Sequence, residues 1–102
     1  MLLVKIEADN CAPCEKLDRF LKSNKRVRKM INKYTTAIKV NSSYEAIPLG
    51  INSMGTPTIV VLDPETKNEL MRLQGTAAYE DLEDSLRTIT GEDDIKTLAF
   101  AK

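Results

Sequence analysis

The segment that most restricts the fold is "TIVVL", residues 58–62, which is almost entirely apolar and rich in β-branched side chains. A short run of this kind is typical of a central strand that is covered on both faces of a sheet. Residues 2–8 alternate between two sets of side chains, which predicts a second strand. The chain of 102 residues has enough length for one domain with a single modest core.

Helical and strand patterns alternate along the rest of the chain. Apolar residues at helical spacing occupy residues 11–34, but the polar segment 22–25 interrupts them, so we expect a long helix that is kinked or broken there. Residues 36–40 predict another strand, and residues 42–50 combine a serine cap with Pro and Gly stops, which predicts a short helix. Turn-forming residues at 63–68 join the apolar strand to a returning strand in a hairpin.

A last helix is predicted before Gly91, from Tyr79, Leu82, Leu86 and Ile89 at helical spacing. The order β-α-β-α-β-β-α indicates an α/β fold with a mixed four-stranded sheet and helices on both faces. We expect residues 1–90 to form this domain. Residues 91–102 begin with acidic residues that suit a helix N-terminus, so we expect a short C-terminal helix or tail, packed on the domain or trailing it.

Charge is unevenly distributed although the net charge is zero. Residues 1–50 carry ten Lys or Arg against five Asp or Glu, and the basic residues concentrate within residues 16–33. Such an excess can steer an acidic partner or contact nucleic acid, but it is more often a solvated helix face. We therefore expect no nucleic-acid partner.

The sequence contains no apolar run near the roughly 20 residues that span a bilayer. The start, "MLLVKIE", lacks the basic region and the length of a signal peptide. We therefore expect a cytoplasmic protein that has no membrane partner and acts as a monomer.

The two cysteines of the chain, Cys11 and Cys14, form a CxxC at the junction of a strand and a helix. Free N–H groups and the helix dipole stabilise a thiolate there, which favours a redox dithiol. One alternative is a structural bridge, which closes a very small loop and so constrains the unfolded chain little. Another is a site for Cu(I) or a shared zinc ion. Histidine is absent, which removes Cys–His catalysis and most zinc sites, so we expect no cofactor and no metal.

A second motif, "GTPT" at residues 55–58, opens the apolar strand. With the CxxC it resembles the thioredoxin superfamily over residues 2–90. The "CAPC" segment differs from the thioredoxin "CGPC" by one alanine. "AIKVN" (37–41) is similar to the family's second strand, and "LQGTAAYEDLEDSL" (73–86) is similar to its last strand and helix. The resemblance implies a minimal thioredoxin fold that starts at the cysteine-bearing strand, as in glutaredoxins.

The resemblance also implies a function. The chain would be a thiol–disulfide oxidoreductase that reduces protein disulfides, with Cys11 as nucleophile and Cys14 as resolving thiol. Pro13 suits the first helical turn, and in the family a proline there accompanies a more reducing couple. Electrons would come from a reductase of the thioredoxin-reductase type or from glutathione. The alternatives are a disulfide oxidase or isomerase and a non-catalytic binding module with the same fold.

The resemblance adds a substrate-binding loop. It implies a cis bond before Pro57, which would place the Thr56 backbone beside Cys11 to pair with an extended substrate. Ala12, Pro13, Met54 and Thr56 would form an apolar rim around the sulfur, although Met54 suits the core equally well.

Two strand residues are candidates for moving the proton of Cys14. Thioredoxins carry a buried Asp where this chain has Lys5, so Glu7 and Lys39 would act as the relay instead. The alternative is a peripheral salt bridge, and Lys5 shares the strand face of Glu7 and competes for it. Asn10 stands where thioredoxins usually have Trp.

Overall fold

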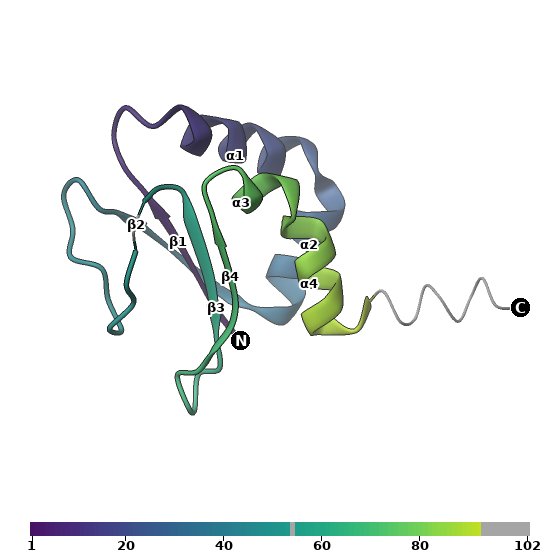
Figure 1. Ribbon diagram of the computed structural model, residues 1–102. Helices are drawn as coiled ribbons and strands as arrows, with labels where there is room; N and C mark the ends of the chain where they lie inside the picture. Colours follow the sequence, from purple (N-terminus) through teal and green to yellow (C-terminus); the bar gives the residue numbers. More distant parts are fainter. Residues whose placement is uncertain (54, 93–102) are drawn as a thin grey trace, which may run out of the picture.

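The computed structural model describes residues 1–53 and 55–92. Four strands form one mixed sheet in the order β2-β1-β3-β4, with β1 parallel to β2 and antiparallel to β3, and β3 antiparallel to β4 (Figure 1). The elements are β1 Leu2–Glu7, α1 Ala12–Ser23, α2 Lys25–Tyr34, β2 Thr36–Asn41, β3 Thr58–Leu62, β4 Glu69–Gln74, α3 Ala77–Glu80 and α4 Leu82–Thr90.

The apolar strand occupies the place predicted for it. All five residues of β3 are buried, because the strand lies between β1 and β4 and both of its faces are covered. The alternation of β1 also appears in the structure: Leu3 belongs to one core cluster, while Val4 and Ile6 belong to the other. The period of two therefore sorts the side chains between two cores.

The helices cover one face of the sheet (Figure 1). Their apolar side chains pack on that face in the larger core, which contains Leu3, Leu17, Val27, Met30, Ile59, Val61, Met71, Ala78, Leu82 and Leu86. The smaller core on the opposite face contains strand residues together with Ile51 and the partly buried Ile47. The segment between β2 and β3 supplies both isoleucines, so a loop takes the place of a helix there.

The mixed four-stranded sheet of the predicted fold class is confirmed, but the placement of helices on both faces is wrong. Residues 42–50 form turns and irregular backbone instead of the predicted helix. The chain makes one turn after Asn41, whose carbonyl accepts the N–H groups of Tyr44 at 3.0 Å and Glu45 at 2.9 Å. Pro48 cannot donate in a helix, and Leu49 has a left-handed φ of 62°. The strands and helices of the described residues therefore follow the order β-α-α-β-β-β-α-α.

The predicted break in the long helix is confirmed at Asn24, which ends α1 and caps α2. Its N–H donates to the Phe20 carbonyl at 2.9 Å, and its Oδ1 accepts the Val27 N–H at 3.0 Å. Its Nδ2 also donates to Glu83 on α4 at 3.0 Å. One side chain thus caps a helix and ties it to a neighbouring helix.

The last helix is divided at Asp81 into α3 and α4 and stops at Gly91, whose φ of 80° favours glycine. Residues 93–102 of the predicted C-terminal extension lie outside the described residues. Among the described helices, none combines the length and apolar character required to cross a bilayer.

Replacing Asn24 by alanine should lower the free energy of unfolding by about 1 kcal/mol, since the cap of α2 is lost. Urea denaturation measures this change. Asn32→Ala is the matched control, because Asn32 is an exposed residue within α2 and alanine favours a helix interior. Equal stability of the two variants would contradict the capping role.

Candidate active site

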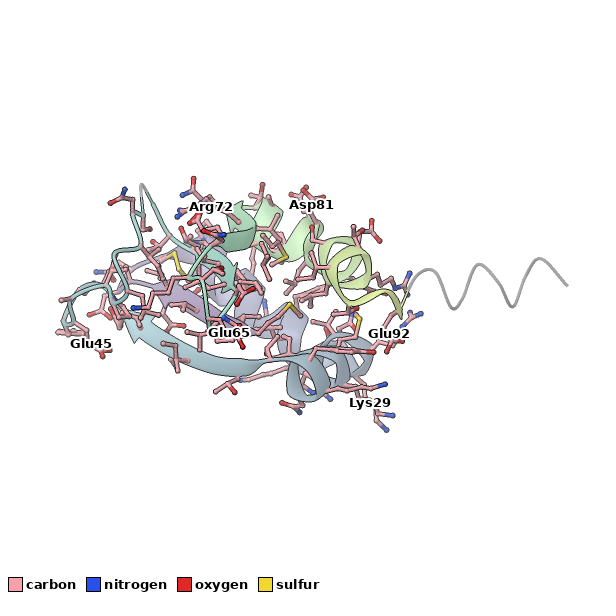
Figure 2. The ribbon with its side chains drawn as sticks, turned by 90° about the horizontal axis from the view of Figure 1, so that it is seen from below. Lys29, Glu45, Glu65, Arg72, Asp81 and Glu92 are labelled. Atoms are coloured by element: carbon pink, nitrogen blue, oxygen red, sulfur yellow. A yellow bond between two sulfur atoms is a disulfide. The ribbon has the colours of Figure 1, made fainter. Side chains whose placement is uncertain are left out.

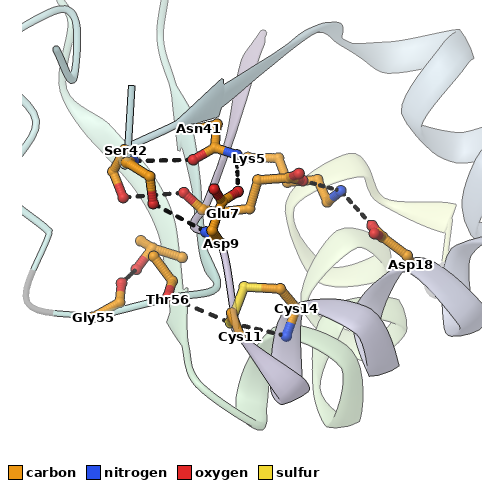
Figure 3. The surroundings of a disulfide bond; sticks show 12 residues. Lys5, Glu7, Asp9, Cys11, Cys14, Asp18, Asn41, Ser42, Gly55 and Thr56 are labelled. Atoms are coloured by element: carbon orange, nitrogen blue, oxygen red, sulfur yellow. Dashed lines mark hydrogen bonds and ion pairs between the residues drawn. A yellow bond between two sulfur atoms is a disulfide. The ribbon is translucent and has the colours of Figure 1, made fainter. Parts of the chain in front are cut away.

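The two cysteines lie at the start of α1 and are joined by a disulfide with a Cα–Cα distance of 5.2 Å (Figure 3). Cys11 is the N-cap residue, and its Sγ accepts the N–H of Cys14 at 3.1 Å. Pro13 lies in the first turn, where a missing N–H breaks no helical hydrogen bond. Cys14 is buried with 5% of its surface exposed, whereas Cys11 is half-buried. The structure thus holds the oxidised pair with Cys11 as the more exposed of the two residues.

The loop before β3 lies beside Cys11. The Thr56 hydroxyl donates to Cys11 Sγ at 3.4 Å, and the Thr56–Pro57 bond is cis, as predicted. Behind it, the hydroxyl of the fully buried Thr58 donates to the Gly55 carbonyl at 2.7 Å. The Gly75 N–H donates to the Pro57 carbonyl at 2.8 Å, which ties the loop to the end of β4. Thr56 is therefore held by a hydrogen bond within its own loop and by one from the residue that follows β4.

The structure describes three of the four residues predicted for the rim. Ala12 is exposed and Pro13 half-buried, next to the disulfide in the chain, and Thr56 contacts Cys11. Met54 lies outside the described residues.

The loop between β1 and α1 is held by a polar cluster that the sequence analysis missed. Asp9 accepts hydrogen bonds from the Tyr44 hydroxyl and from Asn41 Nδ2, and its N–H donates to Ser43 Oγ at 3.0 Å. The bond from Tyr44, followed by that from Asn41, lowers the pKa of the Asp9 carboxyl. These contacts connect residues more than 30 positions apart in the chain, so no local sequence pattern predicts them.

A charged network lies between β1 and α1. Lys5 Nζ contacts Glu7 Oε1 at 2.7 Å and Asp18 Oδ1 at 2.5 Å, and the side chains of Lys5 and Glu7 are only 13% and 15% exposed. Burial lowers the pKa of Lys5, but the hydrogen bonds to Asp18 and Glu7 outweigh this, and the pKa lies above its ordinary value of 10.5. Lys5 is therefore a fixed cation at neutral pH.

The network lies near the cysteine helix (Figure 3). Asp18 follows Cys14 by one helical turn, and residues four apart share a helix face. This spacing was the available signal for Asp18, which the sequence analysis did not name. Lys39 is more peripheral: its Nζ is 3.7 Å from Glu7 Oε2 and its side chain is 67% exposed, because β2 is the edge strand. Lys5 is thus a closer partner of Glu7 than Lys39 is, and Asp18 joins the network through Lys5.

Most of the predicted residues converge at one end of the sheet. The CxxC follows β1, and the Thr56–Pro57 loop precedes β3, which is antiparallel to β1. The described residues contain no group of three or more His, Cys, Asp or Glu side chains arranged to hold a metal ion. The arrangement suits chemistry at sulfur, because it brings together Cys11 and Cys14, the two cysteines of the sequence.

Comparisons with known proteins agree with this geometry. A model of the thioredoxin-like domain matches residues 1–90. The germline-specific thioredoxin Deadhead of Drosophila melanogaster superposes with a TM-score of 0.61 at 16% identity, over 89% of this chain and 78% of that one. A thioredoxin from Thermus thermophilus gives a TM-score of 0.59 at 21% identity, over 87% of this chain and 72% of that one.

No curated protein matches the sequence. At these identities the two structures establish the fold alone, whereas the domain model covers most of the chain. This chain therefore belongs to the thioredoxin-like domain family, and Cys11 and Cys14 supply the cysteine pair of a thiol–disulfide oxidoreductase.

Proposed function

We propose that this protein reduces disulfide bonds in other proteins, with Cys11 and Cys14 as the reacting dithiol. The observation that carries the proposal is the difference in exposure between the two cysteine residues. Cys11 is half-buried at the N-terminus of α1 beside Thr56, whereas Cys14 is buried about one helical turn further along. Thiol–disulfide exchange requires one accessible thiolate that attacks and a second thiol that resolves the mixed disulfide.

In the first step, the Cys11 thiolate of the reduced protein attacks one sulfur of a substrate disulfide. A mixed disulfide forms, and the other substrate sulfur leaves as a thiolate. The Cys14 N–H and the Thr56 hydroxyl, which both donate to Cys11 Sγ in the oxidised structure, would stabilise the thiolate. The N-terminus of α1 adds favourable electrostatics at the same atom.

In the second step, the Cys14 thiolate attacks Cys11 Sγ, and the second substrate sulfur leaves. The product is the Cys11–Cys14 disulfide, which is the form that the structure contains. A thiol or dithiol donor must then reduce the protein again, and we propose either a reductase of the thioredoxin-reductase type or glutathione. Such a cycle suits the cytoplasm, where reductants keep dithiols reduced.

Substrate would bind across the rim of the sulfur pair. The Thr56 backbone, next to Pro57, would pair with an extended segment of the substrate, while Ala12 and Met54 would supply apolar contacts. The exposure of Ala12 and the 3.4 Å contact of Thr56 with Cys11 support this placement.

We further propose that Glu7 helps to take the proton from Cys14, with Lys39 as a weaker member of the relay. Glu7 is the more buried of the two and holds Lys5 at 2.7 Å, and Lys5 in turn holds Asp18. A disulfide oxidase or isomerase, a redox-inactive binding module and a metal-binding role remain the alternatives. The contrast in sulfur exposure favours thiol exchange over the last two.

The reduced protein should reduce insulin disulfides, and its potential should lie near the value of about −270 mV that thioredoxin has. The reason is the proline before the second cysteine in "CAPC". Equilibration with dithiothreitol or glutathione buffers measures the potential. A value above about −180 mV, in the range of protein disulfide isomerase, would identify an oxidant or isomerase instead.

Cys14→Ser should trap a mixed disulfide between Cys11 and the substrate, because the resolving thiol is gone. Cys11→Ser is the control and should trap nothing. Mass spectrometry of the adducts, together with alkylation of the reduced protein, identifies which sulfur reacts first. Preferential labelling of Cys14 would reverse the assigned roles.

Glu7→Gln should slow the resolution step by roughly tenfold, below the usual 10²–10⁴-fold contribution of a direct general base, with little effect on formation of the mixed disulfide. Single-turnover kinetics across pH separate the two steps. Glu15→Gln is the matched control, because Glu15 is exposed and close to the same cysteines in the chain. An unchanged pH profile of resolution would leave Glu7 as a structural ion-pair residue.

A further inference from the structure

The outer face of α1 and α2 carries an excess of positive charge that the exchange chemistry does not use. Residues 12–34 contain eight basic and two acidic side chains, although the whole chain is neutral. The basic residues are Lys16, Arg19, Lys22, Lys25, Arg26, Arg28, Lys29 and Lys33. The rest of the chain therefore carries an equal acidic excess.

Three of these side chains have local partners. Arg26 contacts Glu83 at 3.7 Å, Lys33 contacts Glu92 at 3.6 Å, and Arg28 donates to the Leu21 carbonyl at 2.7 Å. The other five are exposed and have no ion pair or hydrogen bond within residues 1–53 and 55–92. We call these five the basic stripe: Lys16, Arg19, Lys22, Lys25 and Lys29.

The stripe begins at the active site. Lys16 follows Cys14 by two residues, and at about 1.5 Å per residue it lies roughly 8 Å along the helix from Cys11. The next two members follow at spacings of three, and the last two are four apart on α2, so neighbours lie close on the helix surface. Figure 2 shows Lys29 pointing away from the body of the molecule. Measured along the helices, the stripe extends roughly 20 Å from Lys16 to Lys29.

Local helix energetics account for only part of the stripe, since Lys22 suits the last turn of α1 and acidic residues precede Arg19 and Lys22 by four positions. Like charges three and four residues apart repel each other on a helix. Lys25 lies in the first turn of α2, which has no acidic residue, so its charge opposes the helix dipole. Lys16, Lys25 and Lys29 have no such local role. Exposed, unpaired cations that continue along both helices from a point near the reacting sulfur are suited to attracting a partner of the opposite sign.

We propose that the basic stripe docks an acidic surface of the protein whose disulfide is being reduced. This inference rests on the proposed function and names its substrate class. A protein is favoured over a nucleic acid because the stripe has no aromatic side chain on which bases could stack. Phe20 and Tyr34, the aromatic residues of these helices, pack against the larger core instead.

The test uses two peptides that share one intramolecular disulfide and differ in the tail that follows it. One tail has about ten Glu residues and the other has the same number of Gln residues, long enough when extended to cover the stripe. The reduced protein should reduce the Glu peptide about tenfold faster than the Gln peptide at ~0.01 M salt, as electrostatic steering of this size is common. The difference should vanish near 1 M salt, where the Debye length is about 3 Å.

The triple variant Lys22→Gln/Lys25→Gln/Lys29→Gln should remove most of the preference for the Glu peptide, while reduction of the Gln peptide stays unchanged. Lys67→Gln is the control for removing a surface lysine outside the stripe. Lys67 is exposed in the hairpin, and its side chain is likewise unpaired within the described part of the chain. The thermal midpoint of the triple variant should not fall. A loss of stability would mean that the stripe serves the helices.

A third measurement separates docking from catalysis. Fluorescence anisotropy of a labelled Glu peptide without cysteines measures binding to the oxidised protein. Salt-dependent binding without reduction of either peptide would support the stripe and reject the proposed reductase. Equal reduction rates for the Glu and Gln peptides would overturn the inference, as would tighter binding of a DNA oligonucleotide than of the Glu peptide.

Discussion

The antiparallel pairing of β1 with β3 is the constraint on which the active site depends. Its register places Ile6 opposite Thr58, so the strand that leads to Cys11 and the strand that follows Pro57 meet at the same end of the sheet. Because β3 is buried along its whole length, a slip of one residue would turn its side chains to the wrong cores. Core packing therefore fixes the 3.4 Å contact between Thr56 and Cys11, although neither residue belongs to the core.

Because the helices cover only one face of the sheet, the segment between β2 and β3 both covers the other face and supports the active site. Ile47 and Ile51 close the smaller core, and Tyr44 and Ser43 hold the loop before Cys11 through Asp9. The same segment leads into the Thr56–Pro57 loop. One stretch of chain thus supports both sides of the disulfide, so the position of Cys11 depends on this loop as well as on α1, whose N-cap it is.

In the part of the chain that the structure describes, charged side chains near the core are paired, whereas several charged side chains on the surface are not. The half-buried Lys5 is matched by two carboxylates, and no buried side-chain nitrogen or oxygen of the described residues lacks a hydrogen-bond partner. An unmatched charge at that depth would be strongly destabilising. The basic stripe on α1 and α2 is left without such partners, which is tolerable because water solvates it. Unmatched charge therefore appears where another molecule can reach it.

The amino-acid sequence alone predicts the strands, the CxxC at a strand–helix junction, the break at Asn24 and the stop at Gly91, because each depends on periodicity or on a cap within a few residues. It predicted a helix at 42–50 from a serine cap signal, but Ser42 donates to the Glu7 carbonyl and Ser43 accepts from Asp9 instead. It also missed Asp18 as the partner of Lys5. These features depend on tertiary contacts that no local pattern contains, because the competing partners come from chain positions 13 to 35 residues away.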